Sequence, residues 1–436
     1  MNGEQLPQLV TSIPGPASRQ LAVRLRRVES RNITAVEPTP PIFWQQALGA
    51  NVRDVDGNVY IDLTSGFGVA NAGHSNPVVA RAIATQAATL AHALGDVYPA
   101  DIKVLLLERL AQLMPAPLRV SILANSGAEA VEAALKTAVM HTGRTGILAF
   151  NAAYHGLSYG ALSVTQRAHF REPFEHQLFQ GVHFAPFPDE SADAAGVLAQ
   201  IDAIIARADN SQHPIGCIIV EPIQGRGGIV VPPTWFLRAL RERCDGSTRI
   251  LIFDEVYVGV GRTGRWLASE HWQVVPDIAV IGKGLSGALP LSAAVGSAEV
   301  MNAWPASTGE AIHTSTFIGN PIACAAAIAQ LNEIEQRGLL DRARVLGERI
   351  AHRTARWQQD MPAIVATRGI GLIQAVVLPH AEHAAQVVQR CLQQGVLLLM
   401  EGTHANVLAL TPPAVITETQ LDYALDVIEY SLPFGG

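Results

Sequence analysis

Lysine is scarce in this sequence of 436 residues: it stands only at Lys103, Lys136 and Lys283, and arginine supplies the rest of the 31 basic residues. Lys103 and Lys136 fall in amphipathic helical patterns, where a solvated lysine is ordinary. Lys283 lies between Gly282 and Gly284 in apolar surroundings, where loss of water and nearby positive charge lower the pKa of an amine. Lys283 is therefore a candidate functional residue.

Cysteine is also rare, and the four residues that occur have no spacing typical of a metal site. They stand at positions 217, 244, 324 and 391. The absence of a C-x-x-C pair excludes a zinc ribbon, and the scattered positions argue against a disulfide framework. We predict no metal site.

Charge and long apolar runs are limited as well. Only 16% of the residues are charged, the net charge is −7, and no basic block occurs, so there is no electrostatic case for a nucleic-acid or acidic-membrane partner. No uninterrupted apolar run reaches the roughly 18 residues of a spanning helix. The first twenty residues are polar and lack the apolar core of a signal peptide. These absences predict a cytoplasmic protein without nucleic-acid or membrane partners.

The middle of the chain predicts an α/β domain. Apolar runs alternate with helical patterns at residues 119–123, 146–150, 216–220, 249–253 and 278–281. Continuous apolar strands separated by helices indicate a mainly parallel sheet covered on both faces.

The length allows a large domain together with a smaller one. Two short strands around an Asp-Gly turn are expected near residues 50–63, and short strands mixed with helices are expected after residue 360. We predict an N-terminal segment over 1–60 that joins the small domain, a large domain over 61–320, and a small α+β domain over 321–436.

Charged residues follow three of the predicted buried strands. Glu221 comes directly after one strand, Asp254 and Glu255 after the next, and Lys283 after a third. Ligands bind at the carboxyl ends of the strands in an open parallel sheet. Each residue alone has an ordinary alternative as a helix cap or a solvent-facing group, but together they predict one crevice with two acids and a lysine.

Two short motifs suggest other functions and are rejected on context. Residues 259–264 match G-x-G-x-x-G, but the dinucleotide fingerprint needs its glycines at the strand-to-helix turn, and residues 254–258 intervene. Residues 156–160 match G-x-S-x-G, but a nucleophile elbow must directly follow a strand, and the nearest one ends at Phe150. We predict neither a nicotinamide site nor a serine hydrolase.

Further groups suit a phosphorylated aromatic cofactor. Gly127 and Ala128 begin a strong helix, where free amides either bind an anion such as phosphate or are simply capped. Tyr154 offers an aromatic face, and Asp254 offers a fixed carboxylate for a protonated ring nitrogen. Together with Lys283, these groups are the components of a pyridoxal-phosphate site.

The chain resembles the class III pyridoxal-phosphate-dependent aminotransferases of fold type I over nearly its whole length. The order and spacing of the matching stretches make the resemblance specific. They are 54–62 (DVDGNVYID), 73–77 (GHSNP), 125–130 (NSGAEA), 154–156 (YHG), 221–225 (EPIQG), 254–256 (DEV), 261–264 (GRTG), 282–285 (GKGL), Thr316 and 319–321 (GNP).

The resemblance implies roles for the residues around the cofactor ring. Lys283 forms a Schiff base with pyridoxal 5'-phosphate, and Asp254 pairs with the pyridine nitrogen. Tyr154 stacks on one face of the ring, and Val256 packs on the other. Lys283 and Asp254 are thus the expected catalytic residues.

The resemblance also implies an assembly and a fold. Gly127 and Ala128 bind the cofactor phosphate together with Thr316 of the partner subunit, which makes the expected enzyme a homodimer with a shared active site. The expected fold has a large domain around a mainly parallel, seven-stranded sheet and a smaller α+β domain.

Three departures from the family pattern concern the substrate. Tyr257 stands where ornithine- and 4-aminobutyrate-type members have a glutamine, and we expect it near the cofactor's phenolic oxygen. Arg226 stands where those members have a glutamate that gates an arginine, and Ala409 replaces that arginine. Both halves of the gate are therefore missing.

The predicted activity is transfer of an amino group between an amine or amino acid and a 2-oxo acid. An amino-acid racemase of the same family is the alternative, since related racemases share the style of the C-terminal tail. For the substrate, one hypothesis is that Arg226 binds a carboxylate through its planar guanidinium. The other is that Arg226 faces solvent and that apolar groups such as Phe67 guide a neutral amine.

Overall fold

The computed structural model describes residues 1–35 and 40–432. One part of the molecule is built on a seven-stranded sheet with the strand order β4-β10-β9-β8-β7-β5-β6. These strands are β4 (Val120–Ala124), β5 (Gly146–Phe150), β6 (Val182–Ala185), β7 (Ile215–Val220), β8 (Ile250–Asp254), β9 (Ile278–Ile281) and β10 (Ser292–Gly296). All neighbours are parallel except β10, which runs antiparallel to both β9 and β4. The predicted α/β class with a mainly parallel sheet is confirmed.

Two strands of this sheet were not predicted, for physical reasons. β6 (VHFA) lies at the edge of the sheet, and only its last residue is fully buried. β10 (SAAVG) is buried throughout but is made of small residues, with a single β-branched side chain. A short half-exposed edge strand and a strand of small residues both lack the apolar run that reveals a buried strand.

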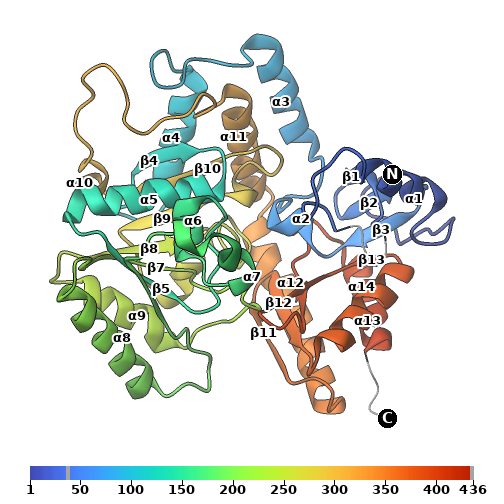
Figure 1. Ribbon diagram of the computed structural model, residues 1–436. Helices are drawn as coiled ribbons and strands as arrows, with labels where there is room; N and C mark the ends of the chain where they lie inside the picture. The colour runs from blue at the N-terminus through green and yellow to red at the C-terminus, as the bar shows by residue number, and fades with distance from the viewer. Residues whose placement is uncertain (36–39, 433–436) are drawn as a thin grey trace.

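Side chains of the central strands alternate between the two faces of the sheet. Ile218 and Val220 of β7 pack with helices α8 (Ala194–Asp209) and α9 (Thr234–Cys244), whereas Cys217 and Ile219 pack with helix α5 (Gly127–Thr142). Since successive strand residues point to opposite faces, β7 is buried on both sides. Figure 1 shows α5 on one side of the strands and α8 and α9 on the other.

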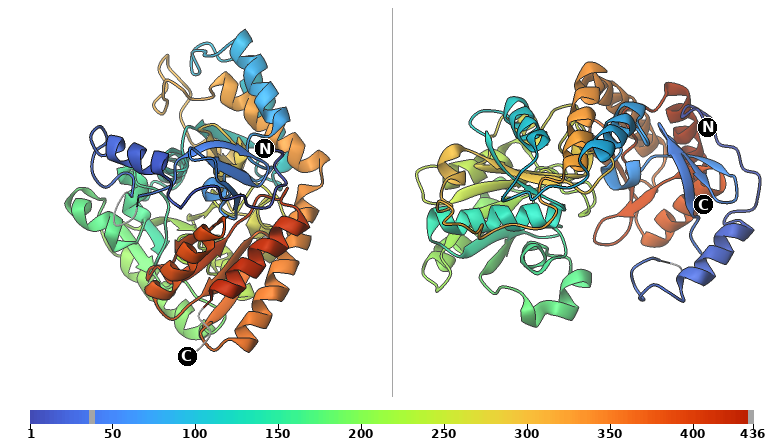
Figure 2. Two further views of the ribbon diagram at one scale, coloured as in Figure 1. Left: turned by 90° about the vertical axis from the view of Figure 1, so that its right-hand side faces the viewer. Right: turned by 90° about the horizontal axis from the view of Figure 1, so that it is seen from above.

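The other part of the molecule combines both ends of the chain. An antiparallel sheet in the order β11-β12-β15-β14 is formed by β11 (Ala366–Ile370), β12 (Ile373–Val377), β15 (Val407–Leu410) and β14 (Leu399–Glu401). A second sheet in the order β1-β2-β3-β13 is formed by β1 (Trp44–Leu48), β2 (Asn51–Asp54), β3 (Val59–Asp62) and β13 (Val396–Leu397). Figure 2 shows the N-terminal strands beside the C-terminal helices. The domain boundaries at residues 60 and 320 stay a prediction.

The remaining α-helices connect and cover these sheets. They are α1 (Pro16–Leu25), α2 (Ser65–Gly68), α3 (Pro77–Thr89), α4 (Asp101–Leu113), α6 (Tyr159–Val164), α7 (Ala168–Arg171), α10 (Ala298–Met301), α11 (Pro321–Gln336), α12 (Leu339–Asp360), α13 (Ala381–Gln393) and α14 (Glu418–Ser431). Short 3-10 helices span Glu172–Gln177, Ala268–Trp272 and Lys283–Leu285.

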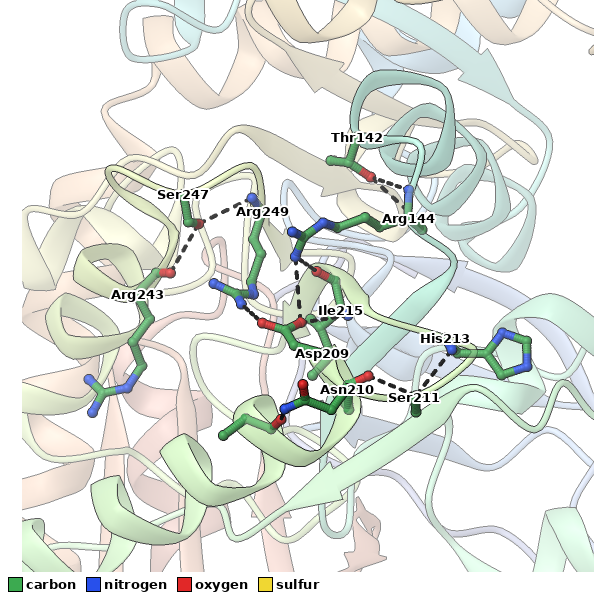
Figure 3. A network of polar contacts seen from close by, with 12 residues as sticks. Thr142, Arg144, Asp209, Asn210, Ser211, His213, Ile215, Arg243, Ser247 and Arg249 are labelled. Atoms are coloured by element: carbon green, nitrogen blue, oxygen red, sulfur yellow. Dashed lines mark hydrogen bonds and ion pairs between the residues drawn. The ribbon is translucent and has the colours of Figure 1, made fainter.

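A polar network joins the strands at their amino ends, away from the predicted site (Figure 3). Asp209, the last residue of α8, pairs with Arg249 before β8 and with Arg144 before β5, the latter at 3.5 Å. It also accepts a hydrogen bond of 3.2 Å from the amide of Ile215, the first residue of β7. One carboxylate therefore ties together three parallel strands.

The residues of the two rejected motifs have structural partners. Arg262, within residues 259–264, is fully buried and donates to the carbonyl oxygens of Leu372, Thr411 and Pro412. Ser158, within residues 156–160, donates to Glu132 at 2.6 Å. Arg262 thus fastens the large sheet's loop to the C-terminal sheet.

Within residues 1–35 and 40–432, no helix combines the length and the apolar character that crossing a membrane requires. The same residues contain no cluster of three or more His, Cys, Asp or Glu arranged to hold a metal ion.

Candidate active site

The carboxyl ends of β7, β8 and β9 place Glu221, Asp254 and Lys283 on the wall of one cavity of about 470 Å³. Asp254 is the last residue of β8, Glu221 directly follows β7, and Lys283 comes two residues after β9, so the strand order β9-β8-β7 brings them together. This is the crevice that the sequence pattern predicts. Its volume lies in the range of small-molecule sites.

Asp254 is held as a fixed carboxylate. One oxygen, Oδ1, accepts a hydrogen bond of 3.0 Å from the amide of Val256, and Oδ2 lies 2.8 Å from Nδ1 of His155. Burial disfavours a charged imidazole, but the hydrogen bond to Asp254 and the charges of Asp254 and Glu221 outweigh burial and raise the pKa of His155. The buried Nε2 of His155 has no hydrogen-bond partner among the described residues.

His155 is a residue that sequence reasoning did not assign to the site. It appears there only as the middle residue of a matching stretch, 154–156. Its contact with Asp254 joins residues far apart in the chain, so the local pattern carries no signal for it.

Glu221 is buried beside this pair and accepts hydrogen bonds from the amides of Tyr154 and Gly225, both at 3.1 Å. Burial, which outweighs these bonds and the charge of His155, raises the pKa of Glu221 to about 7. The carboxyl group anchors the chain on either side of the cavity, since Tyr154 follows β5 and Gly225 follows β7.

Lys283 occupies a strained backbone position inside the cavity. Its φ is 38°, in the left-handed region that residues with a Cβ rarely adopt. Burial and the charge of Arg226 lower the pKa of Lys283, against the raising effects of Asp254, Glu221 and Glu401. An amine with a lowered pKa is more readily available as a base or nucleophile at neutral pH.

The ring of Tyr257 lies next to the amine of Lys283. Nζ of Lys283 lies 4.5 Å from the centre of the Tyr257 ring. The ring fits between two glycines, because a Cβ added at Gly68 would collide with Cε2 and one added at Gly225 would collide with Cδ1. The buried hydroxyl has no hydrogen-bond partner among the described residues.

The beginning of α5 provides an anion site at the cavity. Ser126 caps the helix by accepting from the amide of Glu129 at 3.2 Å. The amides of Gly127 and Ala128 line the cavity and have no acceptor among the described residues. Unpaired amides and the helix dipole favour a phosphate at this end of a helix.

Aromatic and aliphatic groups complete the lining. Tyr154 and Val256 both line the cavity. Val256 packs closely on the backbone, since a Cβ added at Gly127 would meet its Cγ1 at 3.0 Å and one at Gly282 at 3.3 Å. The residues present therefore fit pyridoxal phosphate, because unpaired amides, apolar walls, a fixed carboxylate and a buried amine all converge on one cavity.

Two predicted site residues lie outside this cavity within a single chain. Thr316 is exposed, on the loop before α11, where Ser315 accepts a hydrogen bond of 2.9 Å from the Asn125 side chain. Phe67 is half exposed and does not line the cavity. Their predicted roles stay predictions.

Arg226 lines the cavity and meets a buried acid that the sequence did not single out. Its Nε lies 3.6 Å from Oε2 of Glu401, the last residue of β14. The guanidinium carbon lies 4.8 Å from the centre of the Tyr154 ring and 5.4 Å from that of Phe170. Ala409 is buried on the neighbouring strand β15, opposite Leu399 of β14.

Comparison with known proteins identifies similar chains. The family model described as aminotransferase class-III matches residues 33–432. The 4-aminobutyrate aminotransferase of Mycobacterium leprae is 37% identical over 98% of both chains. The acetylornithine aminotransferase of Methanosarcina mazei is 35% identical over 92% of this chain and 94% of its own.

Solved structures agree in fold. The ornithine aminotransferase of Toxoplasma gondii matches with a TM-score of 0.84 and 30% identity, covering 95% of this chain and 94% of its own. A transaminase from the marine bacterium Virgibacillus matches with a TM-score of 0.90, covering 95% and 98% of the two chains. At 23% identity, the latter supports the fold alone.

Proposed function

This chain belongs to the class-III aminotransferase family, and we propose that it transfers amino groups with pyridoxal 5'-phosphate held in the cavity at the carboxyl ends of β7, β8 and β9. The predicted family and the predicted aminotransferase activity are confirmed by the match over 33–432 and by the named relatives. The observation that carries the cofactor proposal is Lys283, a buried amine beside Asp254 in a cavity with an anion site.

The cofactor, when bound, supplies a ring that accepts electrons as a bond at the substrate's amine-bearing carbon breaks. Lys283 is the residue that would hold the cofactor, and its Nζ, released when the substrate amine takes its place, would receive the proton from that carbon. Asp254, oriented by His155 and Val256, would accept a hydrogen bond from a protonated ring nitrogen. Tyr154 and Val256, which line the cavity, would pack against the ring, and Tyr257 would lie near its phenolic oxygen.

We propose that Gly127 and Ala128 hold the phosphate and that Thr316 of the partner subunit completes its site. This makes the enzyme a homodimer. Exposed apolar side chains near the Thr316 loop support the proposal, because exposed apolar clusters mark interaction sites. They are Leu94, Val97, Tyr98, Ile312 and Phe317.

For the substrates, we propose an amino compound that also carries a carboxylate, with a 2-oxo acid as the acceptor. The relatives are named for 4-aminobutyrate, acetylornithine and 5-aminovalerate, which share these two groups. Arg226, a guanidinium on the cavity wall, is the group of this chain that suits the carboxylate. No observation favours the racemase alternative.

The test is to incubate purified enzyme with 4-aminobutyrate or 5-aminovalerate and 2-oxoglutarate, and to measure glutamate formation. The wild type should form glutamate, and borohydride should fix the cofactor to Lys283. Lys283→Arg, checked for folding by circular dichroism, should do neither. An amino acid whose configuration inverts without any oxo-acid product would instead support a racemase.

A further inference from the structure

A charged pair crosses the junction between the two parts of the molecule at the edge of the cavity. Arg226 follows β7 of the large sheet, and Glu401 ends β14 of the C-terminal sheet. The side chain of Glu401 is 2% exposed, whereas that of Arg226 is 32% exposed. A buried acid thus lies behind a cation that reaches the cavity.

The backbone of Arg226 is fixed to the strand that carries the acid. Its carbonyl oxygen accepts a hydrogen bond of 3.1 Å from the amide of Gly402 and one of 3.3 Å from Arg167. Arg167 also donates to the carbonyl of Gly402 at 3.3 Å, and Arg368 donates to that of Gly228 at 2.8 Å. With the main chain held on both sides, the direction of the guanidinium depends on the contacts of its side chain.

Those contacts leave the outer end of the guanidinium available. Tyr154 and Phe170 hold its plane, and Glu401 attracts its Nε at 3.6 Å. At 3.6 Å this contact is an ion pair rather than a hydrogen bond, and neither atom has a hydrogen-bond partner among the described residues. Within the same residues Glu401 is the one acid that pairs with Arg226. The terminal nitrogens therefore retain the fork that binds a carboxylate through two parallel hydrogen bonds.

Three positive charges act on the carboxyl group of Glu401. Burial raises its pKa, and the charges of Arg226, Arg167 and Lys283 oppose that rise. Removing the acid would leave Arg226, Arg167 and Lys283 without the negative charge that balances them. Removing Arg226 would leave the buried carboxylate of Glu401 without its ion pair. Glu401 thus compensates for the cation on the cavity wall.

From these contacts we propose that Glu401 is the positioning residue for Arg226, and that the pair makes the cavity selective for amino substrates bearing a carboxylate. Glu401 holds Nε from behind, so that the terminal nitrogens point at the substrate. This inference rests on the proposed function for its substrate, but the binding of a carboxylate by this wall does not require turnover.

The test measures binding of butanoate, which has no amine and cannot react, to the purified holoenzyme by titration calorimetry. Arg226→Met should weaken binding roughly ten- to hundredfold, the range for a charge-assisted hydrogen-bonded pair. Arg226→Lys, which keeps the charge but not the fork, should fall between it and the wild type. Arg344→Met, which removes an exposed arginine of α12, is the matched control and should bind like the wild type.

Glu401→Gln keeps the shape of the side chain and removes its charge. It should weaken butanoate binding about three- to tenfold, because the guanidinium loses its orientation. In the double variant Glu401→Gln/Arg226→Met, the glutamate change should add nothing, since Glu401 acts through Arg226. The KM for a carboxylate-bearing amine should rise in parallel, and by a larger factor than the KM of a carboxylate-free amine.

Two outcomes would overturn the proposal. Tighter binding in Glu401→Gln would mean that Glu401 competes with the substrate for Arg226, and additive losses in the double variant would mean that the two residues act separately. A protein that binds butanoate as expected but forms no glutamate would refute the proposed function and leave this inference standing.

Discussion

At the scale of single residues, the cavity is built from ionisable groups that satisfy one another. Asp254 lies between His155 and the amide of Val256, and Glu221 holds the amides that flank the pair. An isolated buried charge is costly, so such groups persist where partners surround them. This arrangement keeps Asp254 oriented toward the cavity before any ligand arrives, which is the preorganisation that binding and catalysis need.

Asp254→Asn tests that arrangement directly. The change preserves the shape of the side chain but removes the charge that a protonated ring nitrogen requires. We expect pyridoxal phosphate to bind roughly ten- to hundredfold more weakly, as for loss of a hydrogen bond between charged groups. Fluorescence quenching during titration of the apoenzyme measures this affinity, and an unchanged dissociation constant would show that Asp254 does not contact the cofactor.

Lys283 predicts a pH dependence of stability. Burial lowers its pKa from the ordinary 10.5 in the folded apoenzyme, so between the two values the unfolded chain binds a proton that the folded chain has lost. Stability therefore rises with pH through this window. Relative to Lys283→Met, the wild-type free energy of unfolding should increase as pH approaches 10.5 and level off above it. Urea titrations at several pH values measure the difference, and a difference that falls with pH would contradict the lowered pKa.

Which site residues the sequence reveals depends on whether their signal is local. Lys283 and Asp254 stand out because each follows an apolar strand, and Gly127 and Ala128 because they begin a helix. Glu401 does not stand out, since its partner Arg226 comes from a distant segment and a different sheet. The packing of Tyr257 between Gly68 and Gly225 cannot be predicted either, because the two glycines are far apart in the sequence.

At the scale of elements, a strand can be predicted from the sequence when its own residues form an apolar run. β5, β7, β8 and β9 are apolar on both faces, so their sequences are continuous apolar runs. β10 is equally buried but small, and its burial comes from neighbours that leave little room, as where a Cβ on Gly296 would meet Met301 at 2.8 Å. Tertiary packing, rather than local preference, makes β10 a strand.

We expect the contacts of Asp209 to stabilise the amino ends of the parallel strands. Asp209→Ala leaves Arg249 and Arg144 without their common partner and the amide of Ile215 without its acceptor. We expect a loss of stability of about 1–3 kcal/mol, typical of partly buried donors left unpaired. The midpoint of urea unfolding measures it.

The control for this prediction is Asp202→Ala, which removes a carboxylate of the same helix that pairs with Arg243 and is largely exposed. It should cost about 0–1 kcal/mol, as exposed pairs do. Affinity for pyridoxal phosphate should stay at the wild-type value in both variants, since the network lies at the opposite end of the strands. An equal loss in the free energy of unfolding from both substitutions would show that Asp209 contributes no more to stability than an exposed ion pair.

At the scale of the whole molecule, the cavity lies where the two parts meet. Arg262 fastens a loop of the large sheet to three carbonyls of the C-terminal part, and Gly402 binds the backbone of Arg226. The C-terminal part therefore supports a lining residue, Arg226, from behind the cavity wall. The beginning of α5 brings the amides of Gly127 and Ala128 to the cavity, whose lining also includes Ser126 and Ser292.

The segments around Leu94–Tyr98 and Ile312–Phe317 lie together, since the rings of His92 and Phe317 are 5.4 Å apart. Tyr98 is 73% exposed and Phe317 is 60% exposed. In Figure 1 the loop before α11 and the connection from α3 to α4 both extend from the same end of the molecule. A second copy of the chain packed here would cover this apolar cluster and bring a Thr316 hydroxyl to the neighbouring phosphate site.

A charge placed in this cluster should therefore separate the subunits and weaken the phosphate site together. Tyr98→Glu/Phe317→Glu buries two acids in the proposed interface, and we expect a monomer by analytical ultracentrifugation at micromolar concentration, because unpaired charges in an interface are strongly unfavourable. The same variant should lose pyridoxal phosphate on dialysis. Val345→Glu, at an exposed apolar position on α12, should change neither property. If the wild type were monomeric and fully active, Thr316 would have no phosphate to reach, and the shared site would be wrong.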